Sequence, residues 1–318
     1  MLKRVVTRLR SAERVLILFH ESPDGDAIAS SLALAETLRR LGKNVDLVCC
    51  DKIPPVFDFL PGVNKIKDDF ISADYDTLCT LDCGDINRTG FPERIKKFAR
   101  TKKCLINIDH HLKNDLHKIA DLNFVNAHAS ATAELVYIIV SELDVKMDKI
   151  LATLLLAGIF TDTGGFQHSN TTPSVYQLAA KLLAKGARLH RLSSRITLNK
   201  SLVTLKLLGI ALTRIWRTDY GVVASLVTQK DLGEAGAQVD DIAGAINVIN
   251  SIPGTRVAIL FQEMPHGKIK ASLRTEEDVN VASLAGIFGG GGHRKAAGFT
   301  VEGKLQHSSG GAWRIALS

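Results

Sequence analysis

Aspartates and histidines that could hold metal ions gather in four short segments that lie far apart in the sequence. They are His20, Asp24, Asp26, Asp82, Asp109, His110, His111 and Asp162. Carboxylates and imidazoles without thiolates suit hard or borderline divalent cations, with Mn²⁺ or Mg²⁺ ahead of a structural zinc. A set of this size exceeds the needs of one ion, whereas two ions about 3.5 to 4 Å apart can clamp the attacking and leaving oxygens of a phosphoryl displacement. These residue types therefore predict a two-metal phosphoesterase.

Each of these segments follows an apolar run. RVLILF precedes His20, TLCTL precedes Asp82 and CLINI precedes Asp109. The run LLLAGIF lies just before Asp162. In an open parallel sheet the carboxyl ends of the strands lie along one edge, and ligands bind in the crevice there. We therefore expect the four distant segments to converge on one site.

An ordinary structural role competes with the metal interpretation at single positions. Asp24 and Asp26 in SPDGDA fit a turn followed by a helix N-cap, and Asp82 fits a turn at the end of a strand. The adjacent imidazoles of His110 and His111 are harder to explain in this way, because buried polar rings need partners. The conjunction of all four segments favours the metal site.

The order of the expected elements predicts an α/β fold in two domains. Short β-rich runs alternate with helical periodicity in the first half of the chain, which is typical of a parallel sheet covered by helices. We expect a first domain over residues 1–195, a connector helix over 196–216 and a smaller α/β domain over 217–318, with the active site in the cleft between the domains. The tail HSSGGAWRIALS shows no periodicity and predicts no regular structure.

Composition excludes several classes of protein. With 318 residues, 46% of them hydrophobic, the chain can bury two cores and is not a disordered protein. It has no long apolar segment and no signal-peptide core, so we expect a cytoplasmic protein without a membrane partner. The five cysteines lack the spacing of a zinc site or a disulfide scaffold. A formal charge of +7 suits a polyanionic ligand without identifying it.

The motifs HESPDGDAIAS, LDCGD, IDHH and FTDTGGF, in this order, resemble those of the DHH phosphoesterase superfamily. The resemblance covers nearly the whole chain and implies a set of ligands for each of two ions. The implied ligands are His20 and Asp24 for one ion, Asp26, His110 and Asp162 for the other, and Asp82 as the bridge between them.

The same resemblance assigns roles to the Asp-His-His triplet. Asp109 would orient His110 through a hydrogen bond, as metal-bound histidines generally require. His111 would face the scissile phosphate and stabilise the charge that develops there, with help to the leaving oxygen as a further role. The implied catalytic residues are therefore Asp82, Asp109 and His111.

A glycine run in the second half, GGGGHRKAAGF, is the other candidate site. Consecutive glycines let backbone N–H groups approach a phosphate closely. Together with KIKASLRT and EDVNVASLAG, this stretch is similar to the DHH-associated C-terminal domain of oligoribonucleases (nanoRNases) and phosphatases of 3′-phosphoadenosine 5′-phosphate (pAp). The resemblance implies that the substrate binds to Arg274, Gly290, Gly291, Gly292 and His293.

The resemblance implies hydrolysis of short oligonucleotides or linear dinucleotides to 5′-mononucleotides, or of pAp to AMP and phosphate. A chain of 318 residues leaves no room for the added barrel that grips long strands, so we expect short single-stranded oligonucleotides or nucleotides as substrates. The expected cofactors are two divalent cations, Mn²⁺ in preference to Mg²⁺ or Co²⁺, and a homodimer is compatible. Two alternatives stay open: an inorganic pyrophosphatase or polyphosphatase, and a non-catalytic nucleotide-binding module.

Overall fold

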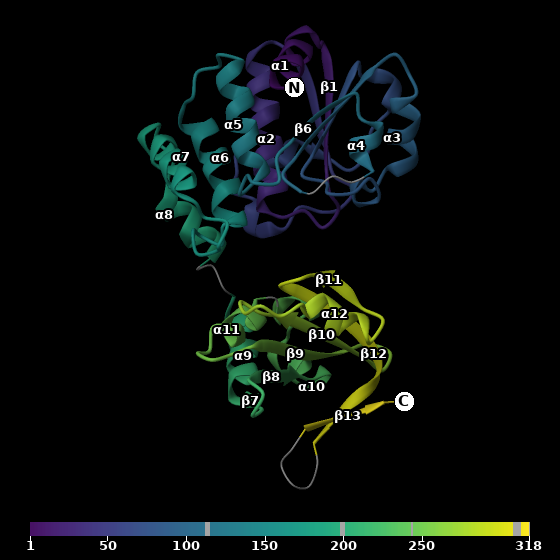
Figure 1. The fold of residues 1–318 in the computed structure, drawn as a ribbon, viewed down its shortest axis with the longest axis vertical. Helices are drawn as coiled ribbons and strands as arrows, with labels where there is room; N and C mark the ends of the chain where they lie inside the picture. Colours follow the sequence, from purple (N-terminus) through teal and green to yellow (C-terminus); the bar gives the residue numbers. More distant parts are fainter. Residues whose placement is uncertain (112–114, 198–200, 243, 308–312, 318) are drawn as a thin grey trace. The chain divides into compact units, whose positions relative to one another are not determined.

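The computed structural model describes residues 1–111, 115–197, 201–242, 244–307 and 313–317 (Figure 1). The chain divides into two compact units, Met1–Asn199 and Lys200–Ser318, and each combines helices with a sheet. Among the described residues, no helix has both the length and the apolar character needed to cross a membrane.

A six-stranded parallel sheet forms the centre of the first unit, as the sequence predicts. Its strand order is β3-β2-β1-β4-β5-β6. The chain therefore runs outward from β1 in one direction and from β4 in the other, and the carboxyl ends of these two adjacent strands are where a doubly wound fold binds ligands. The strands are β1 (Arg14–Phe19), β2 (Asn44–Val48), β3 (Ile66–Lys67), β4 (Thr77–Leu81), β5 (Cys104–Asp109) and β6 (Leu122–Val125).

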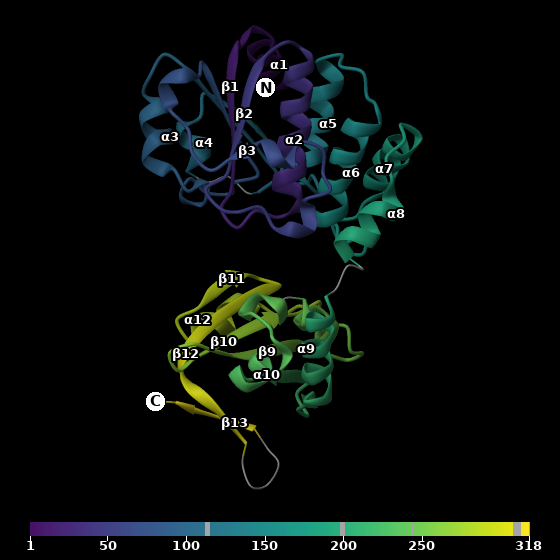
Figure 2. The ribbon, with the colours of Figure 1, turned by 180° about the vertical axis from the view of Figure 1, so that it is seen from behind.

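Helices cover both faces of this sheet (Figures 1 and 2). Because side chains alternate along a strand, Ile17 joins the core beneath α2, α5 and α6, whereas Leu16 and Leu18 join a second core with Ile95 and Phe98 of α3. The helices are α1 (Leu2–Ser11), α2 (Gly25–Arg40), α3 (Pro92–Ala99), α4 (Leu116–Ile119), α5 (Thr132–Glu142), α6 (Lys149–Asp162), α7 (Pro173–Ala184) and α8 (Leu189–Leu192).

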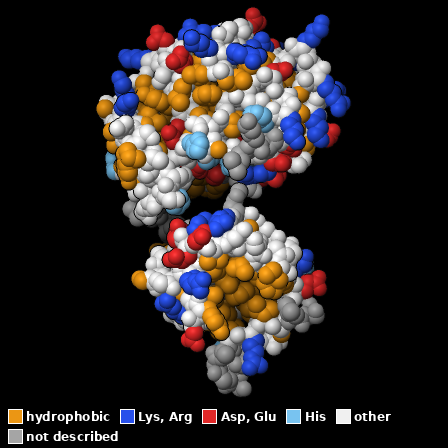
Figure 3. Space-filling model, viewed as in Figure 1, with side chains coloured by type: hydrophobic (Ala, Val, Ile, Leu, Met, Phe, Trp, Pro, Cys, Tyr) orange, Lys and Arg blue, Asp and Glu red, His pale blue; other side chains and the backbone are white. Residues whose placement is uncertain are grey.

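The second unit is built on a mixed sheet with the order β11-β12-β10-β9-β8-β7, and β13 pairs with β12. One face packs on α9, α10 and α11 and part of the other packs on α12. On the side of this unit that is visible in Figure 3, apolar side chains (orange) are exposed at the surface. The elements are α9 (Leu202–Thr213), β7 (Trp216–Arg217), β8 (Val222–Val227), α10 (Gln229–Ala235), α11 (Ala245–Asn250), β9 (Val257–Met264), β10 (Lys268–Arg274), α12 (Val281–Gly286), β11 (Gly291–His293), β12 (Ala296–His307) and β13 (Trp313–Leu317).

The segment expected as a separate connector helix is divided between the two units. Helix α9 buries Leu207 and Ala211 in the core of the second unit, beside Val223 of β8. It is therefore part of that unit, while residues 193–197 form a short helical segment at the end of the first. Positions 198–200 of the predicted connector lie outside the described residues.

The expectation of an irregular tail is wrong for residues 313–317, which form β13 antiparallel to the end of β12. The Trp313 ring lies 5.1 Å from the Arg214 guanidinium, and Ile315 packs near Leu305. Trp313 and Ile315 therefore pack this part of the tail against the cluster that contains Leu305. The residues between β12 and β13, 308–312, lie outside the described part of the chain.

A partly buried ion pair joins the end of α9 to α10 in the second unit. The Arg214 guanidinium donates to both carboxylate oxygens of Asp231, at 2.5 and 2.8 Å. Asp231 also accepts from the backbone N–H and the hydroxyl of Thr228, which forms a capping box at the start of α10. The chain itself thus supplies a full set of partners to this carboxylate.

Candidate metal centre

Three neighbouring strands bring the first candidate residues to one edge of the sheet. Phe19 of β1 pairs with Leu81 of β4, and Leu81 pairs with Ile108 of β5. The residues that come next in each segment are His20, Asp82 and Asp109, so strand register alone places them in one row. Asp82 has a φ of 57°, a left-handed conformation that is rare for a residue other than glycine and typical of functional sites.

Two further aspartates reach this edge from helices. Asp26 lies in the first turn of α2 and is fully buried. Asp162 is the last residue of α6, so the apolar run before it is a helix and not a strand of the sheet. A carboxylate at a helix C-terminus meets the negative end of the helix dipole, and a nearby cation would relieve this repulsion.

The structure brings the candidate ligands into three overlapping groups, in each of which one ligand atom per residue lies within 4.8 Å of the others. Asp82 and His110 each belong to two of them. The groups are His20, Asp24 and Asp82; Asp26, His110 and Asp162; and Asp82, His110 and His111. The first two groups have the composition that the resemblance implies for the two ions, and Asp82 has the central position expected of a bridge.

Asp24 combines the two roles that compete for it in the sequence. Its Oδ1 accepts from the backbone N–H groups of Asp26 and Ala27 and caps α2. Its Oδ2 lies 3.6 Å from Nε2 of His20. The Glu21 carbonyl, 2.7 Å from Nδ1 of His20, favours the proton on Nδ1 and leaves the lone pair on Nε2 for a metal.

Thr132, at the start of α5, holds two of the candidate ligands at once. Its backbone N–H donates to Oδ2 of Asp26 at 2.5 Å, and its hydroxyl donates to Oδ1 of Asp82 at 2.9 Å. The N–H of Ala133 donates to the other oxygen of Asp26 at 3.1 Å. Thr132 does not stand out in the sequence, because a threonine at a helix start is ordinarily a capping residue.

His110 lies between two carboxylates. Its Nε2 is 3.4 Å from Oδ1 of Asp82 and 3.2 Å from Oδ2 of Asp162. Its Nδ1 faces the Ala129 carbonyl at 3.3 Å, which orients the ring. The sequence-based expectation that Asp109 orients His110 is therefore wrong: a backbone carbonyl has that position.

Asp109 instead holds His111. Its Oδ1 accepts from Nδ1 of His111 at 2.8 Å and from the His111 backbone N–H at 2.9 Å. Its Oδ2 accepts from the Gly84 N–H at 2.9 Å. The hydrogen bond from Asp109 raises the pKa of His111 above its usual value, although burial opposes the shift. With Nδ1 donating to Asp109, Nε2 of His111 is the ring nitrogen left for a ligand, and it donates when the ring is protonated.

The electrostatics of the centre fit a pair of cations. Burial and the neighbouring carboxylates raise the pKa of Asp26 well above its ordinary value and raise that of Asp82 as well. The same causes raise the pKa of Asp162 to about 8. Unscreened carboxylates at such distances repel one another strongly in a buried site. Divalent cations would remove this repulsion, and oxygen and imidazole ligands suit them.

The candidate substrate residues lie in the second unit. Arg274 ends β10 opposite Ala296, which also pairs with His293 of β11. A side chain at position 290 would collide with the Gly298 carbonyl, and one at 292 would collide with the Ala296 carbonyl. Close packing on β12 therefore explains two of these glycines, Gly290 and Gly292, whereas position 291 faces open space. Phosphate binding by Arg274 and positions 290–293 stays a prediction.

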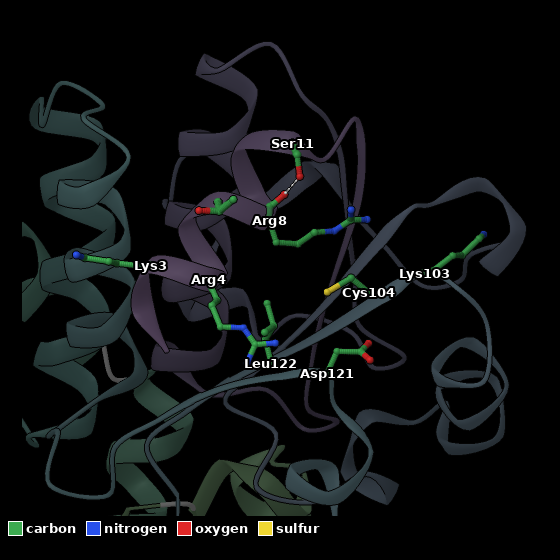
Figure 4. A pocket seen from close by; sticks show the side chains of 9 residues that line it. Lys3, Arg4, Arg8, Ser11, Lys103, Cys104, Asp121 and Leu122 are labelled. Carbon is green, nitrogen blue, oxygen red and sulfur yellow. Dashed lines mark hydrogen bonds between the residues drawn. The ribbon is translucent and has the colours of Figure 1, made fainter.

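A separate surface pocket of about 580 Å³ lies among α1 and the amino ends of β5 and β6, at the opposite ends of the strands (Figure 4). Its basic residues include Arg8, which donates to Thr77 and Asp76, and Lys103, which donates to the Ser72 and Ala73 carbonyls. The side chains of Arg8 and Lys103 thus make structural contacts within the unit. The pocket shares no residue with the candidate metal centre.

Comparisons with known proteins find relatives of both units. Residues 14–159 match the DHH family, N-terminal domain, and residues 219–308 match the DHHA1 domain. The bifunctional oligoribonuclease and PAP phosphatase NrnA of Thermus thermophilus is 34% identical over 292 residues, which are 91% of this chain and 84% of that protein. A protein of the same name from Bacillus subtilis is 25% identical over 91% of this chain and 90% of its own length. An exopolyphosphatase-related protein from Bacteroides fragilis has a similar structure, with a TM-score of 0.87, 26% identity and coverage of 94% of this chain and 90% of that chain.

Proposed function

Because this chain belongs to the DHH family of metal-dependent phosphoesterases, we propose that it hydrolyses short oligonucleotides to 5′-mononucleotides and pAp to AMP and phosphate. The chain is a phosphoester hydrolase by its family. The observation that carries the choice of substrate is the likeness to NrnA proteins, which extends over 91% of the chain and includes both units. A relative that shared only the first unit would support the chemistry but not the substrate.

The arrangement of side chains supports two cations in the first unit. His20, Asp24 and Asp82 would hold one ion, and Asp26, His110 and Asp162 would hold the other, with Asp82 shared. When bound, two such ions supply Lewis-acid activation of water and of the phosphoryl group. Thr132 keeps one oxygen of Asp82 and one of Asp26 in place, and the Ala129 carbonyl keeps the ring of His110 in place.

His111 is the proton donor and charge stabiliser in this proposal. Asp109 accepts from Nδ1 and raises the pKa of the ring, which favours the protonated form in which Nε2 also carries a proton. A protonated imidazole can hydrogen-bond to a non-bridging phosphoryl oxygen, whose negative charge grows in the transition state. It can also give its proton to the departing ribose oxygen. His111 is about a third exposed, as a group that meets a substrate needs to be.

A substrate screen tests the proposal. The protein, loaded with Mn²⁺, would be given pAp, pyrophosphate and oligonucleotides of graded length, and the products would be separated by chromatography. We expect AMP from pAp and mononucleotides from the shortest oligonucleotides, with rates that fall as length increases. Equal rates on pyrophosphate and on a dinucleotide would favour an inorganic pyrophosphatase instead. Loss of turnover after chelation, with recovery on addition of Mn²⁺, would support the metal requirement.

Other expectations from the sequence stay proposals. They are manganese as the metal in the cell, Arg274 and positions 290–293 as the substrate phosphate site, an active site in a cleft between the domains, a homodimer and a cytoplasmic location. A metal screen with Mn²⁺, Mg²⁺ and Co²⁺ at equal concentration ranks the first of these. Substitution Arg274→Gln, with KM measured separately from kcat, addresses the second, because a contact to a remote phosphate contributes mainly to substrate binding.

A further inference from the structure

Arg88 lies beside the metal centre, on a loop that the hydrogen bonds of the first unit hold firmly. It is in the short helical turn η4 (Asn87–Thr89), a few residues after Asp82. Its backbone carbonyl accepts from the N–H of Glu21 at 2.6 Å, which ties the loop after β4 to the residue that follows His20. The Thr89 hydroxyl donates to the Ile86 carbonyl and fixes the turn from within.

The guanidinium of Arg88 lies against the ring of His20, but the nearest ring nitrogen cannot accept a hydrogen bond from it. Its Nη2 is 3.1 Å from Nδ1 of His20. That nitrogen is closer to the Glu21 carbonyl, at 2.7 Å, and donates its proton there, so it has no lone pair to offer Arg88. Within the described ranges of the chain, no carboxylate lies within ion-pair distance of Arg88. The guanidinium therefore keeps its donors for a ligand.

Arg88 and His111 flank the same small space. A methyl group built on Gly84 would be 3.5 Å from Nη1 of Arg88 and 3.5 Å from Cγ of His111. The absence of a side chain on Gly84 thus leaves room between two groups that can both donate to an oxygen anion. The two side chains come from the loops after β4 and β5, whose carboxyl ends are adjacent at the metal centre.

A count of the charges around the proposed metal centre supports a role for Arg88 in binding an anionic substrate. The carboxylates that contact one another or the histidines carry five negative charges when ionised: Asp24, Asp26, Asp82, Asp109 and Asp162. Two divalent cations supply four positive charges and the protonated ring of His111 supplies a fifth, so these groups alone would sum to zero and would not attract an anionic phosphoester. Arg88 adds the positive charge that attracts it. A guanidinium is suited to this because it stays protonated and its fork of donors matches phosphate oxygens.

We propose that Arg88 binds a non-bridging oxygen of the phosphoryl group under attack, across from His111. The proposal rests on the phosphoester hydrolysis assigned to this centre. It adds a substrate contact from the first unit that does not depend on the glycine run of the second. The competing role is a structural one, in which Arg88 only keeps the His20 ring in place for a metal.

Three measurements on Arg88→Gln and Arg88→Lys separate the two roles. They are kcat and KM with pAp, Mn²⁺ affinity by electron paramagnetic resonance, and inorganic phosphate affinity of the Mn²⁺-loaded protein by calorimetry, because the attacked phosphoryl group of pAp is released as phosphate. The matched control is Arg94→Gln, because Arg94 lies in the same unit but pairs with the exposed Asp69. We expect Arg88→Gln to lower kcat/KM by roughly a hundredfold to a thousandfold, as loss of a charge-stabilising donor does. Mn²⁺ affinity should stay unchanged, phosphate binding should weaken, and Arg88→Lys should recover part of the rate.

The outcomes discriminate clearly. Unchanged kcat/KM in Arg88→Gln overturns the proposal, as does a fall in Mn²⁺ affinity with phosphate binding unaltered, which would assign Arg88 the structural role. Normal melting curves of both variants exclude a folding defect, and Arg88→Lys is the second test if the glutamine variant is unstable. A wild-type protein that hydrolyses pyrophosphate and not pAp defeats the proposed function instead. The Arg88 comparison is then made with pyrophosphate, which also presents phosphoryl oxygens.

Discussion

Two buried aspartates, one in each unit, differ in where their opposite charge comes from. Asp231 is 4% exposed and Asp26 is 0% exposed, and both accept backbone N–H groups near a helix start. Burial acts against ionisation of Asp231, but Arg214 and Thr228 outweigh it and lower the pKa of that carboxyl. Burial and the neighbouring carboxylates raise the pKa of Asp26. The chain neutralises the first carboxylate itself, whereas in our proposal bound cations neutralise the second.

The largest effect is expected from removal of the Asp82 carboxylate, which both proposed ions share. Asp82→Asn should lower hydrolysis of pAp by a factor of about a thousand or more, equivalent to ~4 kcal/mol of transition-state stabilisation. The physical reason is that a neutral amide is a poor ligand for two cations. Mn²⁺ should also stabilise the wild type against heat and leave the variant unaffected.

Asp58→Asn is the control for this substitution, because Asp58 is exposed in the same unit. It should retain both hydrolysis and stabilisation by Mn²⁺. Turnover by Asp82→Asn near the wild-type rate would remove Asp82 from the centre and would break the contrast between the two aspartates.

The second prediction concerns the aspartate whose partner is in the chain. Asp231→Ala should lower the free energy of unfolding by roughly 1.5 to 3 kcal/mol, because it removes the buried carboxylate that accepts from Arg214 and Thr228. Mn²⁺ affinity should stay unchanged. Tryptophan fluorescence during urea unfolding is the measurement, since both tryptophans, Trp216 and Trp313, lie in the second unit.

The pH dependence of this effect has a definite sign. Since folding lowers the pKa of Asp231, the pair contributes its full stability above the ordinary carboxyl pKa of about 4. The contribution is lost as the pH falls through the lowered value. The stability difference between wild type and Asp231→Ala should therefore shrink below about pH 4. Asp278→Ala is the control, because its ion pair with Arg294 is exposed and should contribute nothing measurable.

A third prediction uses the tight packing around Asp26. A Cβ at position 158 would lie 2.4 Å from Oδ1 of Asp26 and 2.7 Å from the Cβ of Ala133. Gly158→Ala should therefore destabilise the protein by roughly 1 to 3 kcal/mol and weaken Mn²⁺ binding as well. Gly209→Ala in α9, where nothing lies within 4 Å, should stabilise it by about 0.5 to 1 kcal/mol. Chemical denaturation of both variants gives the two signs, and equal signs would contradict this account of Gly158.

The smallest expected effect concerns the support of the centre. Thr132→Val keeps the shape of the side chain and the backbone N–H to Asp26 but removes the hydroxyl that donates to Asp82. We expect kcat/KM to fall by about tenfold, the lower end of the effects seen when partners of metal ligands are removed. Thr153→Val is the control, because its hydroxyl donates to the Lys149 carbonyl in the same helix. Equal rates for the two variants would show that Thr132 does not support the centre.

The parts of the centre that depend on strands could be predicted from the sequence. An apolar run followed at once by His20, Asp82 or Asp109 needs only parallel register to bring the three together. The sequence could not predict which histidine bonds to Asp109. His110 and His111 both follow Asp109 closely, and the direction in which each ring points depends on packing. Thr132 and Arg88 were also missed, since their contacts lie 50 and 68 residues away in the sequence.

The fold shows the same limits. The alternation of runs predicts the parallel sheet of the first unit, which the structure has. The sequence predicts no regular structure for the tail, because a short strand that pairs with β12 lacks a repeating pattern long enough to recognise. The sequence predicts a connector helix over 196–216, but its apolar residues do not indicate which unit they pack against, and in the structure those of α9 join the core of the second unit.

The left-handed backbone of Asp82 limits which amino acids that position can accept during evolution or design. A φ of 57° is strained for β-branched and bulky residues and is most readily adopted by glycine, asparagine and aspartate. Of these three, only aspartate brings a negative charge. The backbone conformation and the negative charge are thus two independent constraints on position 82, and aspartate is the amino acid that meets both. A designer who wished to move this centre to another sheet would have to copy the turn at the end of β4 together with the carboxylate.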